Sequence, residues 1–497
     1  MSNSQMALPS MQSHAAAQSF PSTWVCPEFK VSGIFSSHMV LQRNKPIRVW
    51  GFSAAPGSVV SGTFMNTAVQ TIVSPDNTWT LIFPAQAATR DPQVMTISDD
   101  RGHSVTFGDI LVGDVWIVGG QSNAELHLES CLCKTPDLVF DENENFRLFF
   151  QAQAYAAQRK DLCAEPQPDI IHPDWCWKKP DRAASVEFSA IGWYFAREVS
   201  QHIDVPLGMV MAAMGGACLR EIVPEDMARA EGYVYGGNVQ IGGYYNTLIH
   251  PLEGLQFTAM LFFQGESEAI VRRQADNYDH ELALMVYDER RRFGFSFPFY
   301  NVQLSNYPKD GPQCFRYADI VRAKQLDAAN IIRDYALAVD MDLGAPEDHP
   351  DWAHSPFKAE LGRRLALLAL AREYGVYEED QISSPAPVQA ILSEDGKTIV
   401  ITFKNTVDGL KAGSLTPEES IGAVLPGFSC GPYETRIPAS ATITSANTVT
   451  VQVPDGADAS QVGYAFFVTV TPENANLANS ISLPCPAFLL PVKKAEA

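Results

Sequence analysis

The sequence predicts an α/β fold with a parallel sheet, flanked on both sides by all-β modules of sandwich type. The chain has 497 residues, which corresponds to about three domains of ordinary size. In its middle part, short apolar runs alternate with helix-like periodicity, as in strands buried on both faces of a parallel sheet and joined by crossover helices. Before and after that part, β-branched and aromatic runs alternate with turns, which is typical of all-β modules.

Four segments follow from these patterns. Residues 1–26 are polar and aperiodic and predict a flexible tail. Residues 27–109 carry strand-like runs separated by turn residues and predict the first β module. Residues 110–382 form the expected α/β domain, and residues 383–497, where the strand-like alternation returns, form the second β module.

The parallel strands of the middle domain are expected at four apolar runs, residues 114–118, 208–212, 259–263 and 336–340. Residues 191–202 and 358–374 have apolar side chains at spacings of three and four, as helices that cover a sheet do. Ligands of a parallel sheet bind outside the carboxyl ends of its strands. The loops after the four runs are therefore the place to look for a site.

Charge and composition exclude several functions. The chain has 36 Lys and Arg against 57 Asp and Glu, a formal net charge of −21, so its mean surface field repels phosphates and anionic headgroups. Neither nucleic acid nor a membrane is an expected partner, and no apolar run reaches the roughly 18 residues of a membrane-spanning helix. The first 24 residues lack the charged and apolar parts of a secretory signal, which favours a cytoplasmic location.

A metal site is not expected either. Cys131 and Cys133, with His127 nearby, are residue types that bind zinc. No second Cys or His pair stands at the spacing that a zinc site requires.

The loop after the first apolar run contains a candidate nucleophile. Residues 119–123 read GGQSN, and the two glycines let the chain turn sharply out of the strand and into a helix. Ser122 then stands at the start of that helix, where backbone amides can stabilise developing negative charge. The alternative for Ser122 is a helix N-cap without a catalytic role.

The loop after the fourth run contains a candidate base. Residues 342–354 are rich in carboxylates and imidazoles, and histidine is the side chain whose ordinary pKa suits a base near neutral pH. Asp351 lies three residues before His354, which lets one short turn hold the imidazole by a carboxylate while its second nitrogen faces the serine. Solvated loop residues without a catalytic role are the alternative.

Two more loops offer hydrogen-bond donors for an oxyanion. Residues 214–217 (MGGA) can present bare backbone amides, and Gln264 in residues 263–267 (FQGES) can present a side-chain amide. Each motif alone is more often a structural turn. Four strand-end loops that each supply a complementary part favour a catalytic site.

These motifs, in this order, resemble a known family over some 450 residues. The matching segments include residues 39–43 (MVLQR), 49–51 (VWG), 113–116 (GDVW), 120–123 (GQSN), 264–267 (QGES), 302–304 (VQL) and 354–358 (HSPFK). The family is the sialate O-acetylesterase-like carbohydrate esterases, whose catalytic domain belongs to the SGNH hydrolase superfamily. The resemblance implies an SGNH-type three-layer domain for residues 110–382.

The resemblance also assigns roles to residues. It implies that Ser122 is the nucleophile, that His354 is the base, and that the oxyanion donors are the amides of Ser122 and Gly216 with the side chain of Gln264. Asp351 is the expected partner of His354, with Asp348 and Glu266 as alternatives. His349 is expected to be at most a loop or substrate contact.

We further expect Gln121, Asn123 and Glu266 to contact the substrate. The predicted function is removal of O-acetyl groups from sugars, first of all from sialate, by a serine acyl-enzyme mechanism without metal or organic cofactor. Acetylated xylo- or manno-oligosaccharides are the alternative substrates, and a non-catalytic sugar-binding protein is the alternative from another class. The sequence predicts an acetylated sugar as partner and leaves the oligomeric state open.

Overall fold

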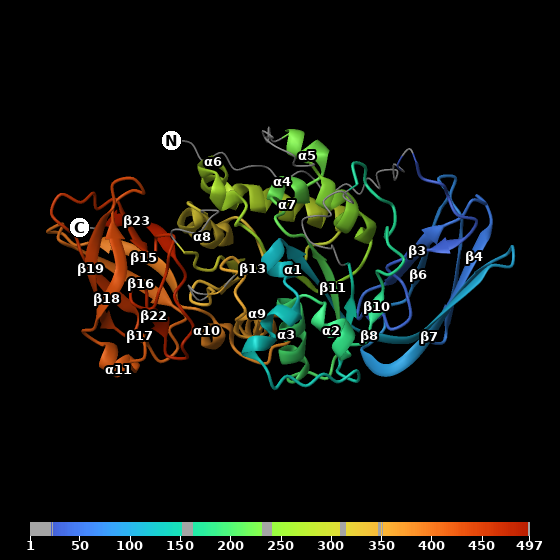
Figure 1. Ribbon diagram of the computed structural model, residues 1–497, viewed down its shortest axis with the longest axis horizontal. Coiled ribbons are helices and arrows are strands. Elements are labelled where there is room, and N and C mark those ends of the chain that lie inside the picture. Colours follow the sequence, from blue (N-terminus) through green and yellow to red (C-terminus); the bar gives the residue numbers. More distant parts are fainter. Residues whose placement is uncertain are drawn as a thin grey trace.

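The computed structural model describes residues 21, 23–151, 163–230, 241–308, 315–345, 349 and 351–495. Figure 1 shows an elongated molecule in which a region of helices and strands lies between two β-rich ends. The prediction of a mixed α/β fold is confirmed. Most of the predicted tail lies outside the described residues.

The central sheet positions the candidate site. Its strands lie in the order β10-β9-β11-β8-β12-β13-β14. Their bounds are β8 Ser104–Gly120, β9 Phe146–Phe149, β10 Trp177–Lys178, β11 Leu207–Ala213, β12 Ala259–Phe263, β13 Phe299–Gln303 and β14 Tyr335–Val339. From β9 to β14 each neighbouring pair is parallel, and β10 at the edge is antiparallel to β9. The loops that follow these parallel strands therefore meet along one edge of the sheet.

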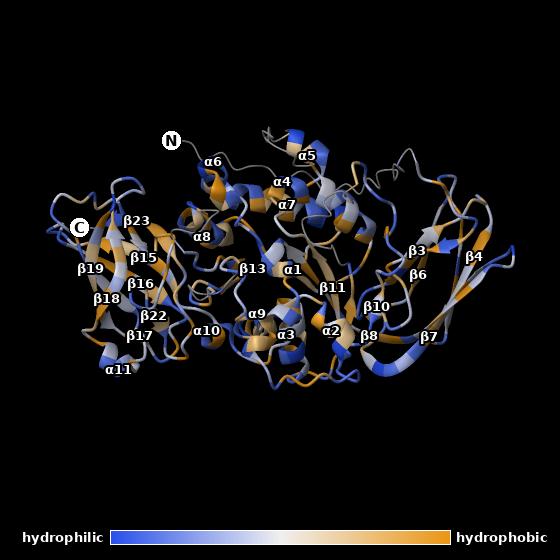
Figure 2. Cartoon of the chain, in the orientation of Figure 1, coloured by the Kyte–Doolittle hydropathy of each residue, from blue (hydrophilic) through white to orange (hydrophobic). Residues whose placement is uncertain are grey.

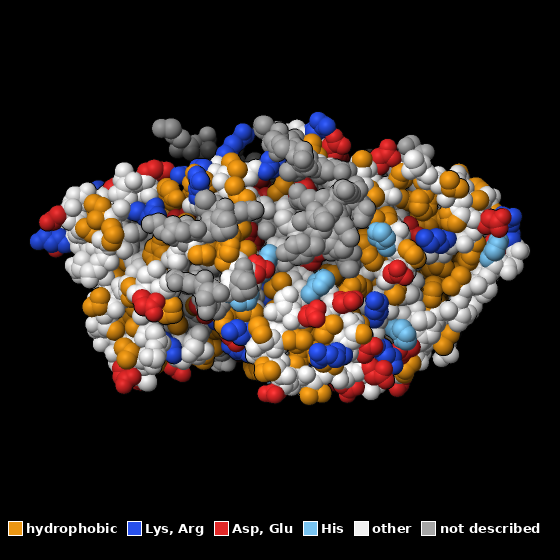
Figure 3. Space-filling model, in the orientation of Figure 1, with side chains coloured by type: hydrophobic (Ala, Val, Ile, Leu, Met, Phe, Trp, Pro, Cys, Tyr) orange, Lys and Arg blue, Asp and Glu red, His pale blue; other side chains and the backbone are white. Residues whose placement is uncertain are grey.

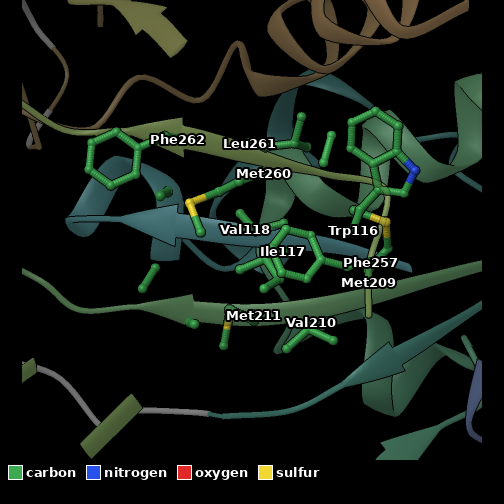
Figure 4. Close-up of a cluster of buried hydrophobic side chains, with 14 of the residues drawn as sticks. Trp116, Ile117, Val118, Met209, Val210, Met211, Phe257, Met260, Leu261 and Phe262 are labelled. Atoms are coloured by element: carbon green, nitrogen blue, oxygen red, sulfur yellow. The ribbon is translucent and has the colours of Figure 1, made fainter. Parts of the chain in front are cut away.

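The four predicted apolar runs coincide with β8, β11, β12 and β14. Figure 4 shows buried side chains of three of these strands, among them Ile117 of β8, Met209 of β11 and Leu261 of β12. The apolar pattern does not reveal β13, because Asn301 and Gln303 interrupt its run although both are buried.

Helices cover both faces of this sheet (Figure 1). Helices α3 (Ala190–Ser200) and α9 (Lys358–Arg372) pack together on one face, and α7 (Tyr278–Phe293) and α8 (Ala318–Asp327) lie on the other. Figure 2 shows hydrophobic colouring along strands of the sheet and more polar colouring on the outer turns of the helices. Among the described residues no helix is both long and apolar enough to cross a bilayer.

The N-terminal strands are continuous with the central sheet. The first half of β8 pairs antiparallel with β7, and its second half pairs parallel with β11 and β12. The boundary predicted between residues 109 and 110 thus falls inside one strand. The other strands of this region are β1 Lys30–Val31, β2 Val40–Gln42, β3 Ile47–Phe52, β4 Val59–Phe64, β5 Thr67–Ile72, β6 Thr78–Phe83 and β7 Thr89–Asp99.

The C-terminal module is a closed barrel, so the predicted sandwich is wrong for this part of the chain. The barrel strands, in spatial order, are β15 Ala386–Leu392, β16 Thr398–Lys404, β20 Thr448–Gln452, β19 Ile437–Ser445, β18 Val424–Cys430, β21 Gln461–Tyr464 and β23 Phe488–Lys494. Alternating burial marks a strand with one buried face, in a sandwich and in a barrel alike. Closure depends on the pairing of β15 with β23, which lie about a hundred residues apart and carry no local signal of it.

Gln303 of β13 joins the barrel to the central sheet. Its side chain donates to the carbonyl of Ala487 at 3.0 Å and accepts from the amide of the same residue at 2.9 Å. This two-bond contact attaches the start of β23 to the sheet.

Candidate active site

A sharp turn at the end of β8 places Ser122 at the edge of the sheet. Gly120 has φ +125°, and a Cβ at this position would lie 2.1 Å from the carbonyl oxygen of Phe263. Only glycine fits such a conformation and approach. The amide of Gln121 then donates to the same Phe263 carbonyl at 2.9 Å, and the short helix α1 (Ser122–Glu125) begins.

The side chain of Gln121 ties this turn to the loop after β12. It is buried, and its Oε1 accepts from the Gln264 side chain at 3.1 Å. The same oxygen also lies 3.3 Å from the amides of Gly265 and Ser267. The side-chain carbonyl of Gln121 therefore joins the loop after β8 to the loop after β12.

Asn123 ties the turn to the loop that carries His354. Its Nδ2 donates to Glu266 Oε1 at 2.6 Å and to the carbonyl of Ala353 at 3.0 Å. Tyr307 donates to the same Glu266 oxygen at 2.9 Å. Since Ser122 and His354 are the chain neighbours of Asn123 and Ala353, this contact brings the two predicted catalytic residues to the same region. In the space-filling view, histidine and acidic side chains gather near the middle of one face (Figure 3).

His354 is oriented by Asp351. Its Nδ1 lies 2.7 Å from Asp351 Oδ2, and the imidazole is 14% exposed while the carboxylate is 48% exposed. Of the two alternatives, Glu266 bonds to Asn123 and Tyr307 instead, and Asp348 lies outside the described residues. His349 contacts the backbone of Asp351, with its Nδ1 at 2.8 Å from the carbonyl oxygen.

The reactive atoms of the predicted pair are Ser122 Oγ and His354 Nε2. Within the described ranges, neither Ser122 Oγ nor Nε2 of His354 forms a hydrogen bond. A hydroxyl and an imidazole nitrogen in this state are available to a substrate and to each other.

The glycine pair lies beside Ser122. The position where a Cβ of Gly215 would stand is 3.8 Å from Ser122 Cβ, and Gly216 follows with φ +69°. The amide of Gly215 donates to Glu125 Oε2 at 2.6 Å. The structure therefore brings Gly215, the chain neighbour of the predicted donor Gly216, close to the predicted nucleophile.

Gln264 is fully buried, and its amide has internal partners. Nε2 donates to Gln121 Oε1 at 3.1 Å, to the carbonyl of Ala217 at 3.2 Å and to Glu268 Oε2. An amide has two N–H groups for these three acceptors. The predicted role of Gln264 as an oxyanion donor thus requires that one N–H turn away from these acceptors, which leaves a single N–H for all three.

Gln121, Asn123 and Glu266 are likewise buried, and their hydrogen bonds join loops. A direct contact of these three side chains with substrate stays a prediction. The described part of the chain contains no group of three His, Cys, Asp or Glu side chains arranged to hold a metal ion.

Two buried carboxyl groups near the site were not singled out from the sequence. Desolvation raises the pKa of Glu125 to about 7, against the opposing effect of the hydrogen bond from Gly215. Desolvation also raises the pKa of Glu268 to about 7, opposed by hydrogen bonds from Gln264 and Leu219. Nothing in the local sequence distinguishes these glutamates from solvated helix residues.

Comparisons with known proteins agree with this architecture. Residues 112–371 match the family model described as carbohydrate esterase, sialic acid-specific acetylesterase. The sialate O-acetylesterase of Mus musculus is 22% identical over 409 residues, covering 70% of this chain and 74% of the mouse protein. The one of Homo sapiens is 23% identical over 384 residues, covering 70% and 71%.

A solved structure agrees with the family match. The crystal structure of a carbohydrate acetylesterase from Xanthomonas citri superposes with a TM-score of 0.78 at 27% identity, covering 93% of this chain and 99% of that one. The class that fold and family model define is the carbohydrate esterases. Within it, the chain belongs to the sialic acid-specific acetylesterase family.

Proposed function

We propose that this esterase removes O-acetyl groups from sugars through an acyl-enzyme on Ser122, with acetylated sialic acid as the first candidate substrate. The observation that carries the proposal is the contact from Asn123 to Ala353, 3.0 Å long, which joins the chain neighbours of a hydroxyl and of a carboxylate-bound imidazole. The sialate O-acetylesterases matched over about 70% of the chain support the choice of substrate.

The proposed reaction has two steps. His354 Nε2 takes the proton of Ser122 Oγ as the oxygen attacks the acetyl carbonyl carbon, and Asp351 holds the imidazolium that forms. The tetrahedral oxyanion accepts from the amides of Ser122 and Gly216. When the C–O bond to the sugar breaks, the imidazolium gives its proton to the leaving oxygen. A water molecule, deprotonated by the same imidazole, then attacks the acetyl-serine and releases acetate.

A variant at the nucleophile tests the mechanism. We expect Ser122→Ala to lower kcat for an aryl acetate by more than about a thousandfold and to prevent labelling by a serine-directed fluorophosphonate. Ser130→Ala is the matched control, because Ser130 is exposed on the next turn of the chain, and it should keep wild-type kinetics and labelling. Substantial turnover by Ser122→Ala would discard the mechanism. Absence of labelling in the wild-type protein would favour the non-catalytic sugar-binding protein instead.

The substrate is tested separately. Acetate release is measured from O-acetylated sialic acid and from acetylated xylo- and manno-oligosaccharides at equal ester concentration. We expect the highest kcat/KM for the sialate ester. A higher value for either neutral oligosaccharide would move the proposed specificity to that sugar and leave the ester chemistry intact.

A further inference from the structure

The carboxyl group of Glu125 lies beside the nucleophile and has no place in the reaction described so far. Glu125 is three residues after Ser122 on α1 and is buried. Its Oε2 accepts from the amide of Gly215 at 2.6 Å. A Cβ added to Gly215 would lie 3.1 Å from this oxygen and 3.8 Å from Ser122 Cβ. The carboxyl group, the glycine turn and the nucleophile are therefore close neighbours.

Hydrogen bonds hold the glycine turn. Besides the contact with Glu125, the amide of Ala217 donates to the carbonyl of Met214 at 3.1 Å, and Ser267 Oγ donates to the carbonyl of Gly216 at 3.2 Å. Gly215 and Gly216 have no side chains that could fix their backbone by packing, and Gly216 is in the left-handed region. A peptide N–H must point within a narrow range at an oxyanion to stabilise it. The amide of Gly215 is held by a side chain from the helix that carries the nucleophile, so the donor turn and Ser122 keep a fixed relation to each other.

We propose that Glu125 is a positioning residue: by accepting the Gly215 amide, it fixes the Gly215–Gly216 turn so that the Gly216 amide faces the oxyanion formed at Ser122. The inference rests on the proposed acyl-enzyme function. It assigns Glu125 no contact with substrate. A hydrogen-bond acceptor is required at this position, and a negative charge is not.

The negative charge of Glu125 should lower the activity once the carboxyl group ionises. The elements packed against α1 are β8, β11, β12 and α3, and in the described part of the chain no lysine or arginine pairs with Glu125. Among the described residues, Tyr244 responds to this charge: burial raises the pKa of Tyr244, and the charge of Glu125 raises it further. With a pKa of about 7, Glu125 ionises above neutral pH, and its charge then opposes the oxyanion beside it.

Two variants separate the acceptor from the charge. Glu125→Ala removes the acceptor and should lower kcat for an aryl acetate about 10- to 100-fold with KM nearly unchanged. Glu125→Gln keeps a carbonyl oxygen for the Gly215 amide and should retain kcat within about threefold at pH 7. Glu129→Gln, an exposed glutamate four residues on, is the matched control and should behave as wild type.

The pH profile gives the readout that a merely structural role would not change. Wild-type kcat should fall about threefold to tenfold as Glu125 ionises above pH 7. Glu125→Gln should lose this fall, because its side chain cannot ionise. This measurement needs only the conservative variant, so it decides the matter even where Glu125→Ala does not fold.

The outcomes are distinct. Wild-type kcat in a folded Glu125→Ala, an equal loss in the Gln and Ala variants, or an unchanged fall at high pH in Glu125→Gln would each overturn the inference. None of these would touch the proposed function, whose failure is substantial turnover by Ser122→Ala.

Discussion

The two segments that supply the candidate nucleophile and base are held in different ways. Contacts with neighbouring elements fix the turn that carries Ser122. Gly120 lies against the backbone of β12. The side chains of Gln121 and Asn123 are buried and form hydrogen bonds to neighbouring loops. The imidazole of His354 depends on a local turn, in which it is held by a carboxylate that is 48% exposed. The sheet and its neighbouring loops therefore fix the geometry of the nucleophile, while one loop with a half-exposed carboxylate fixes the geometry of the base.

The largest effect should come from the turn beneath the nucleophile. In Gly120→Ala the new Cβ would meet the Phe263 carbonyl in a backbone conformation that alanine rarely adopts, so the strands must separate. We expect the free energy of unfolding to fall by about 3 kcal/mol or more, with loss of esterase activity. Denaturant titration of the purified variant measures the change.

Gly102→Ala is the control for that experiment. Gly102 also has a positive φ, +98°, but nothing lies within 4 Å of its Cβ position. Its loss should be about 1 kcal/mol, since only the backbone conformation is unfavourable. Similar losses at the two glycines would show that the close approach under Ser122 does not matter, and the contrast between the two segments would disappear.

The sequence predicted which strand-end loops meet at the candidate site better than it predicted the contacts that hold those loops. Strand-end loops of a parallel sheet converge by geometry, so four apolar runs were enough to bring Ser122 and His354 to one edge. The bond from Asn123 to Ala353 spans 230 residues and has no local pattern. The position of Gln264, wholly inside the protein, was equally hidden, because burial depends on what packs above a loop.

The same limit explains the misassigned β module. Alternation and turns predicted strands in residues 383–497, and strands are present there. Whether the first and last of them pair is decided by twist and strand tilt over the whole module. Local periodicity carries no information about twist and tilt. The pattern therefore predicts a sandwich where β15 and β23 close a barrel.

A smaller effect should follow from the carboxylate that holds the base. We expect Asp351→Ala to lower kcat about 30- to 100-fold with KM unchanged, because the imidazole loses its orientation and its counter-charge. The loss should stay below the roughly 10⁴-fold known for buried partners of a catalytic histidine, since water can partly replace a half-exposed carboxylate.

His349→Ala is the comparison for this variant. His349 bonds to the backbone of Asp351, and its removal leaves the bond to His354 in place, so kcat should change by less than about threefold. A 10⁴-fold loss in Asp351→Ala, or no loss, would show that the exposure of the carboxylate is a poor guide to its contribution. Steady-state kinetics on an aryl acetate distinguish these results.

The smallest and most informative effect should come from Asn123, the residue that joins the two segments. Asn123→Ala removes the donor to Ala353 and leaves Glu266 with Tyr307 as its remaining donor. We expect kcat to fall about tenfold and the free energy of unfolding to fall by about 1–3 kcal/mol. Asn143→Ala, at an exposed asparagine that bonds within its own loop to Asp141, should change neither.

The double variant Asn123→Ala/Asp351→Ala tests whether the effects of the two segments on kcat are coupled. If Asn123 acts by holding the loop that carries His354, its removal should cost less once Asp351 no longer orients the imidazole, and the two losses in kcat should be less than additive. Fully additive losses would mean that the base does not depend on the hydrogen bond from Asn123 to Ala353. In that case the segment with Ser122 would be self-sufficient, and the contact between Asn123 and Ala353 would contribute to stability alone.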